Sequence, residues 1–184
     1  MLGPAPVAWL LVALCAASGG YCLLRLRSGV EEQRRAAGLD TLMAFGMAAM
    51  AVPAAALAAP RGVWIAMAAV FAAAALRTLW PPHSAPRHLH HLVGAGAMAY
   101  MAALMAAMPA GHAGHMAHGG GPPLLTGALL LYFAGHALLA GARLIPVATA
   151  GGPPVHVAWG DRPELARVCG LTMSLGMVAM LGAL

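Results

Sequence analysis

The stretch HLVGAGAMAYMAALMAAM, residues 91–108, contains no Asp, Glu, Lys or Arg and consists mostly of small, apolar and sulfur-containing residues. A helix needs about 20 predominantly apolar residues to cross the hydrocarbon layer of a bilayer, so this stretch and its flanks are long enough. Its methionines recur every three or four residues, which is the spacing of one face of an α-helix. The stretch therefore predicts a membrane-spanning helix with a methionine-lined face.

Five further apolar runs have a similar length, and the six lie at about residues 5–24, 39–59, 62–80, 89–109, 123–144 and 165–184. Charged, proline-rich or glycine-rich connections separate them, and proline disfavours the continuation of a helix. Charged residues make up 8% of the chain, against roughly 25% in a soluble domain. We predict an all-α, polytopic membrane protein, with a single transmembrane domain over residues 1–184 folded as a six-transmembrane-helix bundle.

The ten basic residues are all arginine, and nine of them fall on one side of the membrane if the N-terminus lies outside. Arg61 is the exception. Because cytoplasmic loops carry the excess of positive charge, both the N-terminus and the C-terminus are predicted to lie outside. The arginine, alanine and glycine content is typical of a bacterium, so we expect a multi-pass protein of the bacterial cytoplasmic (inner) membrane. The arginines lie at helix ends and not on one soluble face, so nucleic acid is not expected as a partner.

Three of the predicted helices repeat one spacing of methionines, in the segments DTLMAFGMAAM, HLVGAGAMAYM and GLTMSLGMVAM. Residues at positions i, i+4 and i+7 share a helix face, so each segment carries a methionine stripe. The stripes comprise Met43, Met47 and Met50; Met98, Met101, Met105 and Met108; and Met173, Met177 and Met180, with Cys169 one turn before Met173. Alternate spans run in the same direction, so the three stripes are predicted to converge on one interior seam.

Sulfur-rich faces of this kind are suited to binding a soft metal. Thioether and thiolate ligands favour Cu(I), and imidazole binds copper in either oxidation state. Neutral thioethers also avoid the cost of placing charged ligands inside a membrane. The stripes are therefore predicted to bind copper. The open alternative is packing, because methionine is flexible and polarisable and fills irregular gaps between helices.

A histidine- and methionine-rich loop is predicted outside the membrane at residues 110–122. Its candidate ligands are His112, His115, Met116 and His118, and the glycines among them would let the imidazoles close around one ion. Histidine-rich tracts are a compositional signal of metal binding. Copper is the expected metal, with zinc as the alternative at this loop. A neutral hydrophilic linker is the alternative to any metal.

Three ionisable residues are expected at similar depth near the cytoplasmic ends of the helices: Asp40, His91 and His136. An ionisable residue inside a membrane points to function by default, here metal binding or proton relay. The alternative for Asp40 is a role at the start of its helix, where the helix dipole favours a carboxylate. Simple packing or headgroup contacts are expected for Cys15, Cys22, His88 and His90.

The segments HHLVGAGAMAYM (residues 90–101) and LTMSLGMVAM (residues 171–180) resemble a family of small actinobacterial membrane proteins known as domain of unknown function 5134. The resemblance implies a similar size and helix number. It points to His91, Met98 and Met101 in one helix and to Met173, Met177 and Met180 in another. This sequence departs from the family pattern at Gly94, in place of a methionine, and at Gly170, in place of a histidine. The resemblance implies a fold and no established activity.

The function expected from these features is copper handling, meaning transport, storage or delivery of Cu(I) along the seam. The expected partners are the lipid bilayer, the copper ion and a cuproenzyme or copper chaperone, with a homo-oligomer as a further candidate. No P-loop, HExxH or GxSxG motif occurs, so a primary pump is excluded and a non-enzymatic role is favoured. Two alternatives stay open: a structural or assembly subunit without metal, and a membrane oxidoreductase using copper or haem with His91 and His136 as axial ligands.

Overall fold

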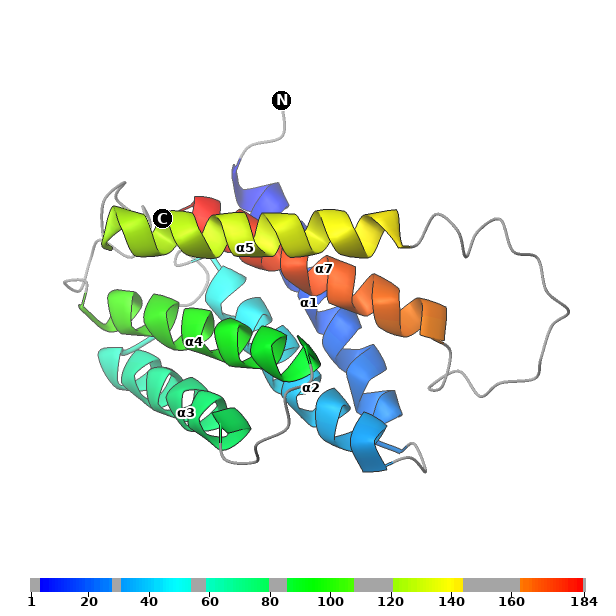
Figure 1. Ribbon diagram of the computed structural model, residues 1–184. Coiled ribbons are helices and arrows are strands. Elements are labelled where there is room, and N and C mark those ends of the chain that lie inside the picture. The colour runs from blue at the N-terminus through cyan, green and yellow to red at the C-terminus, as the bar shows by residue number, and fades with distance from the viewer. Residues whose placement is uncertain are drawn as a thin grey trace, which may run out of the picture.

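The computed structural model describes residues 4–27, 31–53, 59–79, 86–107, 121–143 and 163–183. Every regular element in these ranges is an α-helix, which confirms the predicted all-α class (Figure 1). The helices are α1 (Pro4–Arg25), α2 (Glu31–Ala51), α3 (Arg61–Leu79), α4 (Pro86–Ala107), α5 (Pro123–Ala142) and α7 (Pro163–Gly182). Of the predicted metal-binding loop, residues 110–122, all but the last two positions lie outside the described residues.

Four segments are long and apolar enough to cross a membrane: Pro6–Arg25, Arg61–Leu79, Leu89–Ala107 and Pro123–Ala142. The apolar parts of α2 and α7 are shorter, because charged residues occupy the first turns of both helices. Large apolar side chains lie exposed along α1, α3 and α5, among them Leu10, Leu76 and Leu131. A large exposed apolar surface is unfavourable in water and favourable in lipid. These features define a membrane-embedded helical protein.

The second helix lies earlier in the chain than predicted. It begins at Glu31 and not near residue 39, because the Glu, Gln and Arg residues of EEQRRAAG are good helix formers. It ends at Ala51 and not near residue 59, because Pro53 lacks the N–H group that another turn would need. Asp40 therefore lies in the middle of α2, and the expectation that it begins the helix is wrong.

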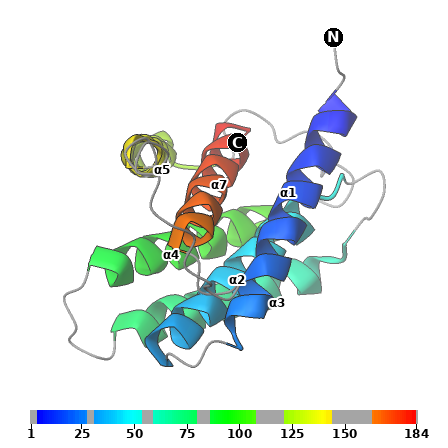
Figure 2. The same cartoon turned by 90° about the vertical axis from the view of Figure 1, so that its right-hand side faces the viewer.

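The helices pack as three pairs around a shared centre. α1 lies along α2, α3 along α4 and α5 along α7, and α2 also contacts both α4 and α7. Figure 2 shows α7 between α5 and α1, with α4 beneath it. The central helices α2, α4 and α7 are the three that carry the methionine stripes.

Contacts between α2 and α4 show that these two helices run in the same direction. Asp40 lies beside His91, with 3.6 Å between Oδ1 and Nδ1. One to two turns further along both helices, a Cβ atom placed at Gly46 would lie 2.9 Å from Cε of Met98. Contacts that advance together along two helices require parallel helices in register. The prediction that alternate helices share a direction is therefore confirmed for this pair.

α7 is in the same register as α2 and α4. A Cβ atom placed at Gly176 would lie 3.5 Å from Sδ of Met47, and Met173 and Met177 adjoin Met43 and Met47. Equivalent positions of the sequence repeat thus form three layers: Met43, Gly94 and Met173; Met47, Met98 and Met177; and Met50, Met101 and Met180. All eight methionines of these layers are buried in one apolar cluster, and the partly buried Met105 packs against it. The predicted inward orientation of these stripe residues is confirmed.

Candidate functional site

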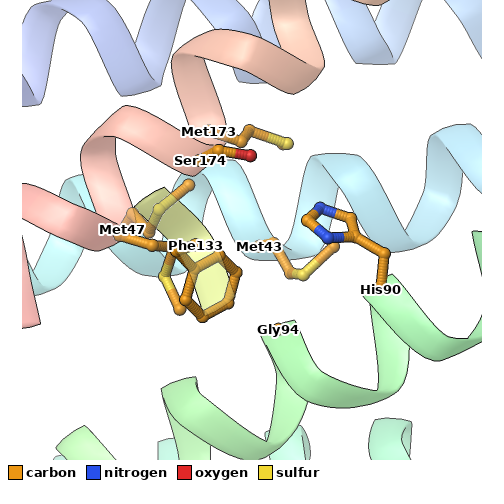
Figure 3. A pocket seen from close by; sticks show the side chains of 8 residues that line it. Met43, Met47, His90, Gly94, Phe133, Met173 and Ser174 are labelled. Atoms are coloured by element: carbon orange, nitrogen blue, oxygen red, sulfur yellow. The ribbon is translucent and has the colours of Figure 1, made fainter. Parts of the chain in front are cut away.

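The stripes enclose a small internal cavity of about 10 Å³, roughly the space of one water molecule. Its walls come from α2, α4, α5 and α7 (Figure 3). The lining residues are Met43, Met47, His90, Gly94, Phe133, Met173, Ser174 and Met177. Four thioethers and one imidazole thus border the same space, and these are ligand types that soft metals prefer.

Gly94 leaves the room that Met43 occupies in the cavity wall. A Cβ atom placed at Gly94 would lie 3.0 Å from Sδ of Met43, which is tighter than an ordinary contact. A methionine at position 94, as in the resembled family pattern, would displace that sulfur. The sulfur atom at this point of the cavity wall therefore belongs to Met43 of α2 and not to a residue of α4. At Gly170, by contrast, nothing lies within 4 Å of an added Cβ atom, so no side chain fills that position.

His90 lies in the cavity wall, where other aromatic rings hold it. Its imidazole stacks on that of His136, with 3.9 Å between the ring centroids and 13° between the planes, and the ring of Phe133 meets it edge-on. The expectation of a simple headgroup contact for His90 is therefore wrong. The signal was present in the sequence, because His90, Gly94 and Met98 are four residues apart and share one face of α4.

A hydrogen bond to Ser174 fixes the orientation of His136, with 3.1 Å between Nδ1 and Oγ. The Ser174 hydroxyl donates to the carbonyl oxygen of Gly170 on its own helix, so it accepts a hydrogen bond from the His136 ring. This network assigns the His136 proton to Nδ1 and leaves a lone pair on Nε2. Imidazoles that bind metals are commonly oriented through their other nitrogen in this way.

An ion-pair cluster joins α1, α2 and α4 at one end of the stripes. Arg25 Nη1 lies 3.7 Å from Asp40 Oδ2, and His91 Nδ1 lies 3.6 Å from Asp40 Oδ1. The predicted proximity of Asp40 and His91 is confirmed, whereas His136 contacts His90 and Ser174 instead. Burying a charge in a membrane is costly, and a partner of opposite sign lowers that cost.

The three cysteines add thiols to the same interior. Cys22 Sγ and Cys169 Sγ lie 3.3 Å apart, and both side chains are buried. Cys15 Sγ would lie 3.7 Å from a Cβ atom placed at Gly176, a position that also borders Met47. Simple packing was expected for Cys22, and its meeting with Cys169 was missed because it depends on how α1 packs against α7. The sequence spacing within α1 carries no signal of that contact.

Most predicted site residues within the described ranges lie together in the interior, with the stripe methionines and Cys169 in one cluster. Five predicted ligands lie outside the described residues: Met108, His112, His115, Met116 and His118. Within the described ranges, no group of three or more His, Cys, Asp or Glu side chains could hold a metal ion. A site with three or more ligands in this interior therefore requires methionine sulfur.

The fold and the cavity together define a class: a membrane-embedded helical protein whose central helices carry sulfur-containing side chains into a shared core. The chain belongs to the family described as domain of unknown function (DUF5134), which matches residues 32–184. The resemblance inferred from the repeated segments is thus confirmed, and α1, with Cys15 and Cys22, lies outside the matched residues. Comparison with curated proteins and with solved structures gives no match.

Proposed function

We propose that the protein binds Cu(I) inside the membrane, in the cavity lined by Met43, Met47, Met173, Met177 and His90. The observation that carries the proposal is the convergence of four thioethers from two helices and one imidazole from a third on a single space. Soft sulfur ligands favour Cu(I), and imidazole also binds copper. The resulting role is copper handling: transport, storage or delivery of Cu(I) to a cuproenzyme or copper chaperone.

Neutral ligands suit a monovalent ion in an apolar interior. Thiols and protonated histidines must lose a proton before they bind a metal, whereas a thioether has no proton to lose. Binding at the methionines therefore adds only the single charge of Cu(I) to the core. A buried charge is costly without compensation. A complex that carries only one charge therefore makes it easier for the ion to enter the core and to leave it again.

We further propose six spans in the bacterial cytoplasmic membrane, with both termini outside, as the arginine distribution favours. The outer loop would then receive copper, with zinc as the alternative metal there. From the loop to the ion-pair cluster, the proposed order of ligands is His112, His115, Met116 and His118; Met108 and Met105; Met50, Met101 and Met180; Met47, Met98 and Met177; Met43 and Met173 with His90; and Asp40 with His91. A homo-oligomer is compatible with this path and is not required by it.

The test is a Cu(I) titration of detergent-purified protein against a competing chromophoric chelator. The variant carries Met43→Leu, Met47→Leu, Met173→Leu and Met177→Leu, because leucine nearly conserves the volume of methionine and removes its sulfur. The matched control is Met67→Leu on α3, which packs against the same cluster but lies outside the stripes. We expect the variant to lose about one bound ion per chain and the control to lose none.

Retention of all bound copper by the four-leucine variant would contradict the proposed cavity site. Replacement of His112, His115 and His118 by alanine tests the outer loop separately. That variant is expected to bind fewer ions at the loop and to keep the ion in the cavity. A chain that binds no copper at all would contradict both sites.

A second candidate is a structural or assembly subunit of a membrane complex, without metal. The observation that favours it is the close filling of the core: Met98 and Met101 are fully buried, and the cavity measures only about 10 Å³. Methionine fills such gaps well without any metal. The titration separates the two candidates, because a packing role predicts no stoichiometric copper in the unaltered chain.

A further inference from the structure

Two cysteines that are far apart in the sequence meet outside the lining of the methionine cavity. Cys22 on α1 and Cys169 on α7 place their sulfur atoms 3.3 Å apart, and both side chains are buried. The Cys169 thiol also lies 3.9 Å from the carbonyl oxygen of Ser18, which can accept its proton in a weak hydrogen bond. The copper site proposed above uses neither thiol.

The separation of the two sulfur atoms is that of a thiol pair. A disulfide bond is about 2.05 Å long, clearly shorter than the observed 3.3 Å, and both cysteines are free. Two thiolates are sufficient for Cu(I), which accepts linear two-coordinate geometry and favours soft sulfur ligands. A modest rotation of the two side chains would open the pair to admit such an ion.

The charged residues Arg25 and Asp40 lie beside the pair of cysteines. Arg25 lies one turn after Cys22 on α1, and both Arg25 and Asp40 are close enough to interact electrostatically with the two sulfur atoms. The side chains of Arg25 and Asp40 are 13% and 18% exposed, so this end of the core approaches the surface. Two thiolates around a monovalent cation carry one net negative charge, which the Arg25 guanidinium stabilises and the Asp40 carboxylate opposes.

Cys15 provides an internal comparison on the same helix. It is buried two turns before Cys22 and lies near Gly176, but it has no second thiol beside it, because the chain's other two cysteines form the pair. Simple packing of small side chains explains Cys15 fully. It does not explain why the other two thiols of the chain lie in contact next to an arginine.

We propose that Cys22 and Cys169 form a second Cu(I) site, a two-thiolate site at the Arg25–Asp40 end of the stripes. It rests on the proposed function for the identity of the ion. On binding, two S–H bonds break and two Cu–S bonds form. The copper remains Cu(I), and the two protons leave to water past the partly exposed Arg25 and Asp40. The step needs no oxidant or reductant. It adds a thiolate site for Cu(I) to the proposed copper handling, beside the thioether cavity.

The experiment adds Cu(I) to the reduced, detergent-purified full chain and follows two signals. One is the thiolate-to-copper charge-transfer absorption in the near ultraviolet, and the other is proton release to a weakly buffered indicator dye. We expect the absorption in the unaltered chain together with release of about two protons per ion bound by the pair. Cys22→Ser and Cys169→Ser are each expected to abolish both signals, and the matched control Cys15→Ser is expected to keep them.

An absorption that persists unchanged in Cys22→Ser or Cys169→Ser overturns the two-thiolate site. So does an unaltered chain that shows neither signal, or one isolated with the two cysteines joined in a disulfide, which alkylation and mass spectrometry detect. The signals of the unaltered chain are readable even where a serine variant does not fold. The four-leucine variant separates the two proposals: if absorption persists in it and no copper is lost, the cavity site fails while the thiolate site stands.

Discussion

At the scale of single residues, hydrogen bonds and ion pairs join polar side chains of this apolar interior. Ser174 is the one fully buried polar residue in the described ranges, and it connects His136 to the backbone of α7. The Asp40 carboxylate lies between Arg25 and His91. Without these contacts, each polar group would carry its full cost of transfer out of water.

Ser174→Ala is expected to lower the free energy of unfolding by about 1 kcal/mol, because His136 loses the acceptor for its Nδ1–H. The measurement is unfolding in mixed detergent micelles with increasing dodecyl sulfate, followed by circular dichroism. The control is Thr78→Ala, since the Thr78 hydroxyl bonds to the carbonyl oxygen of Ala75 within its own helix. Equal losses in the two variants would mean that the contact between α5 and α7 contributes nothing.

Asp40→Asn is expected to lower the free energy of unfolding by about 1–2 kcal/mol, because the partly buried Arg25 keeps its charge and loses its counter-ion. The matched control is Arg27→Gln, which removes an exposed charge two residues further along and is expected to change stability by less than about 0.5 kcal/mol. The same unfolding measurement checks both variants. An effect of Asp40→Asn no larger than that of Arg27→Gln contradicts a structural role for the pair.

Sequence spacing predicted which methionines face inward, because a periodicity of three and four residues identifies a helix face regardless of what lies opposite. The same spacing also includes His90, which lies in the cavity wall and not at the headgroups. The contact between Cys22 and Cys169 was beyond the reach of spacing, since it joins residues 147 positions apart. Residue-scale prediction thus succeeded for helix faces and for the proximity of Asp40 and His91, and it failed for the partners of His90 and Cys22.

At the scale of elements, the helices approach closely where glycine faces a large side chain. A Cβ atom placed at Gly46 on α2 would overlap the ring of Phe71 on α3 and lie 2.9 Å from Cε of Met98 on α4. Small residues at helix interfaces allow this kind of close packing in membranes. Gly46 therefore sets the distance of α2 from two neighbours at once.

Gly46→Ala is expected to destabilise the protein by about 1–3 kcal/mol, since both neighbours would have to shift to relieve the overlap. The matched control is Gly96→Ala on α4, where nothing lies within 4 Å of the added Cβ atom. That control is expected to be neutral or slightly stabilising, because alanine favours helix more than glycine does. Unfolding in dodecyl sulfate ranks the two, and the reverse order would contradict the described packing of α2.

Element boundaries were predictable where the apolar run and the helix coincide. Five helices begin and end within three residues of their predicted limits. α2 differs because helix formation and membrane insertion follow different properties. The charged segment EEQRRAAG is a good helix former but a poor membrane segment, so the helix begins well before its apolar part. Hydropathy alone therefore missed the charged first turns of α2, and it also extended the predicted helix past Pro53 to about residue 59.

At the scale of the whole molecule, the sequence repeat places equivalent residues of three helices at the same depth along the bundle. Three segments with the same methionine frame lie parallel and in register, so equivalent positions share a layer. The repeat alone could not say which layer encloses a cavity, because that depends on Gly94, on His90 one turn before it and on Phe133 of α5. It did give the direction of the helices, and that direction bears on how many of them cross the membrane.

The shared register of α2 and α4 predicts that α2 crosses the bilayer although its apolar part, Ala36–Ala51, is short. α4 contains a segment able to span, Leu89–Ala107, and α2 follows it at equal depth from Asp40 to Gly46.

Cysteines introduced at the two sides of α2, by Arg27→Cys and Pro60→Cys, should therefore react with a membrane-impermeant maleimide from opposite faces. In intact cells, the cysteine at position 60 should label directly and the one at position 27 only after permeabilisation. The unaltered chain is the control, since its own cysteines are buried. Labelling of both positions from one face would place α2 on the membrane surface and contradict the six-span arrangement.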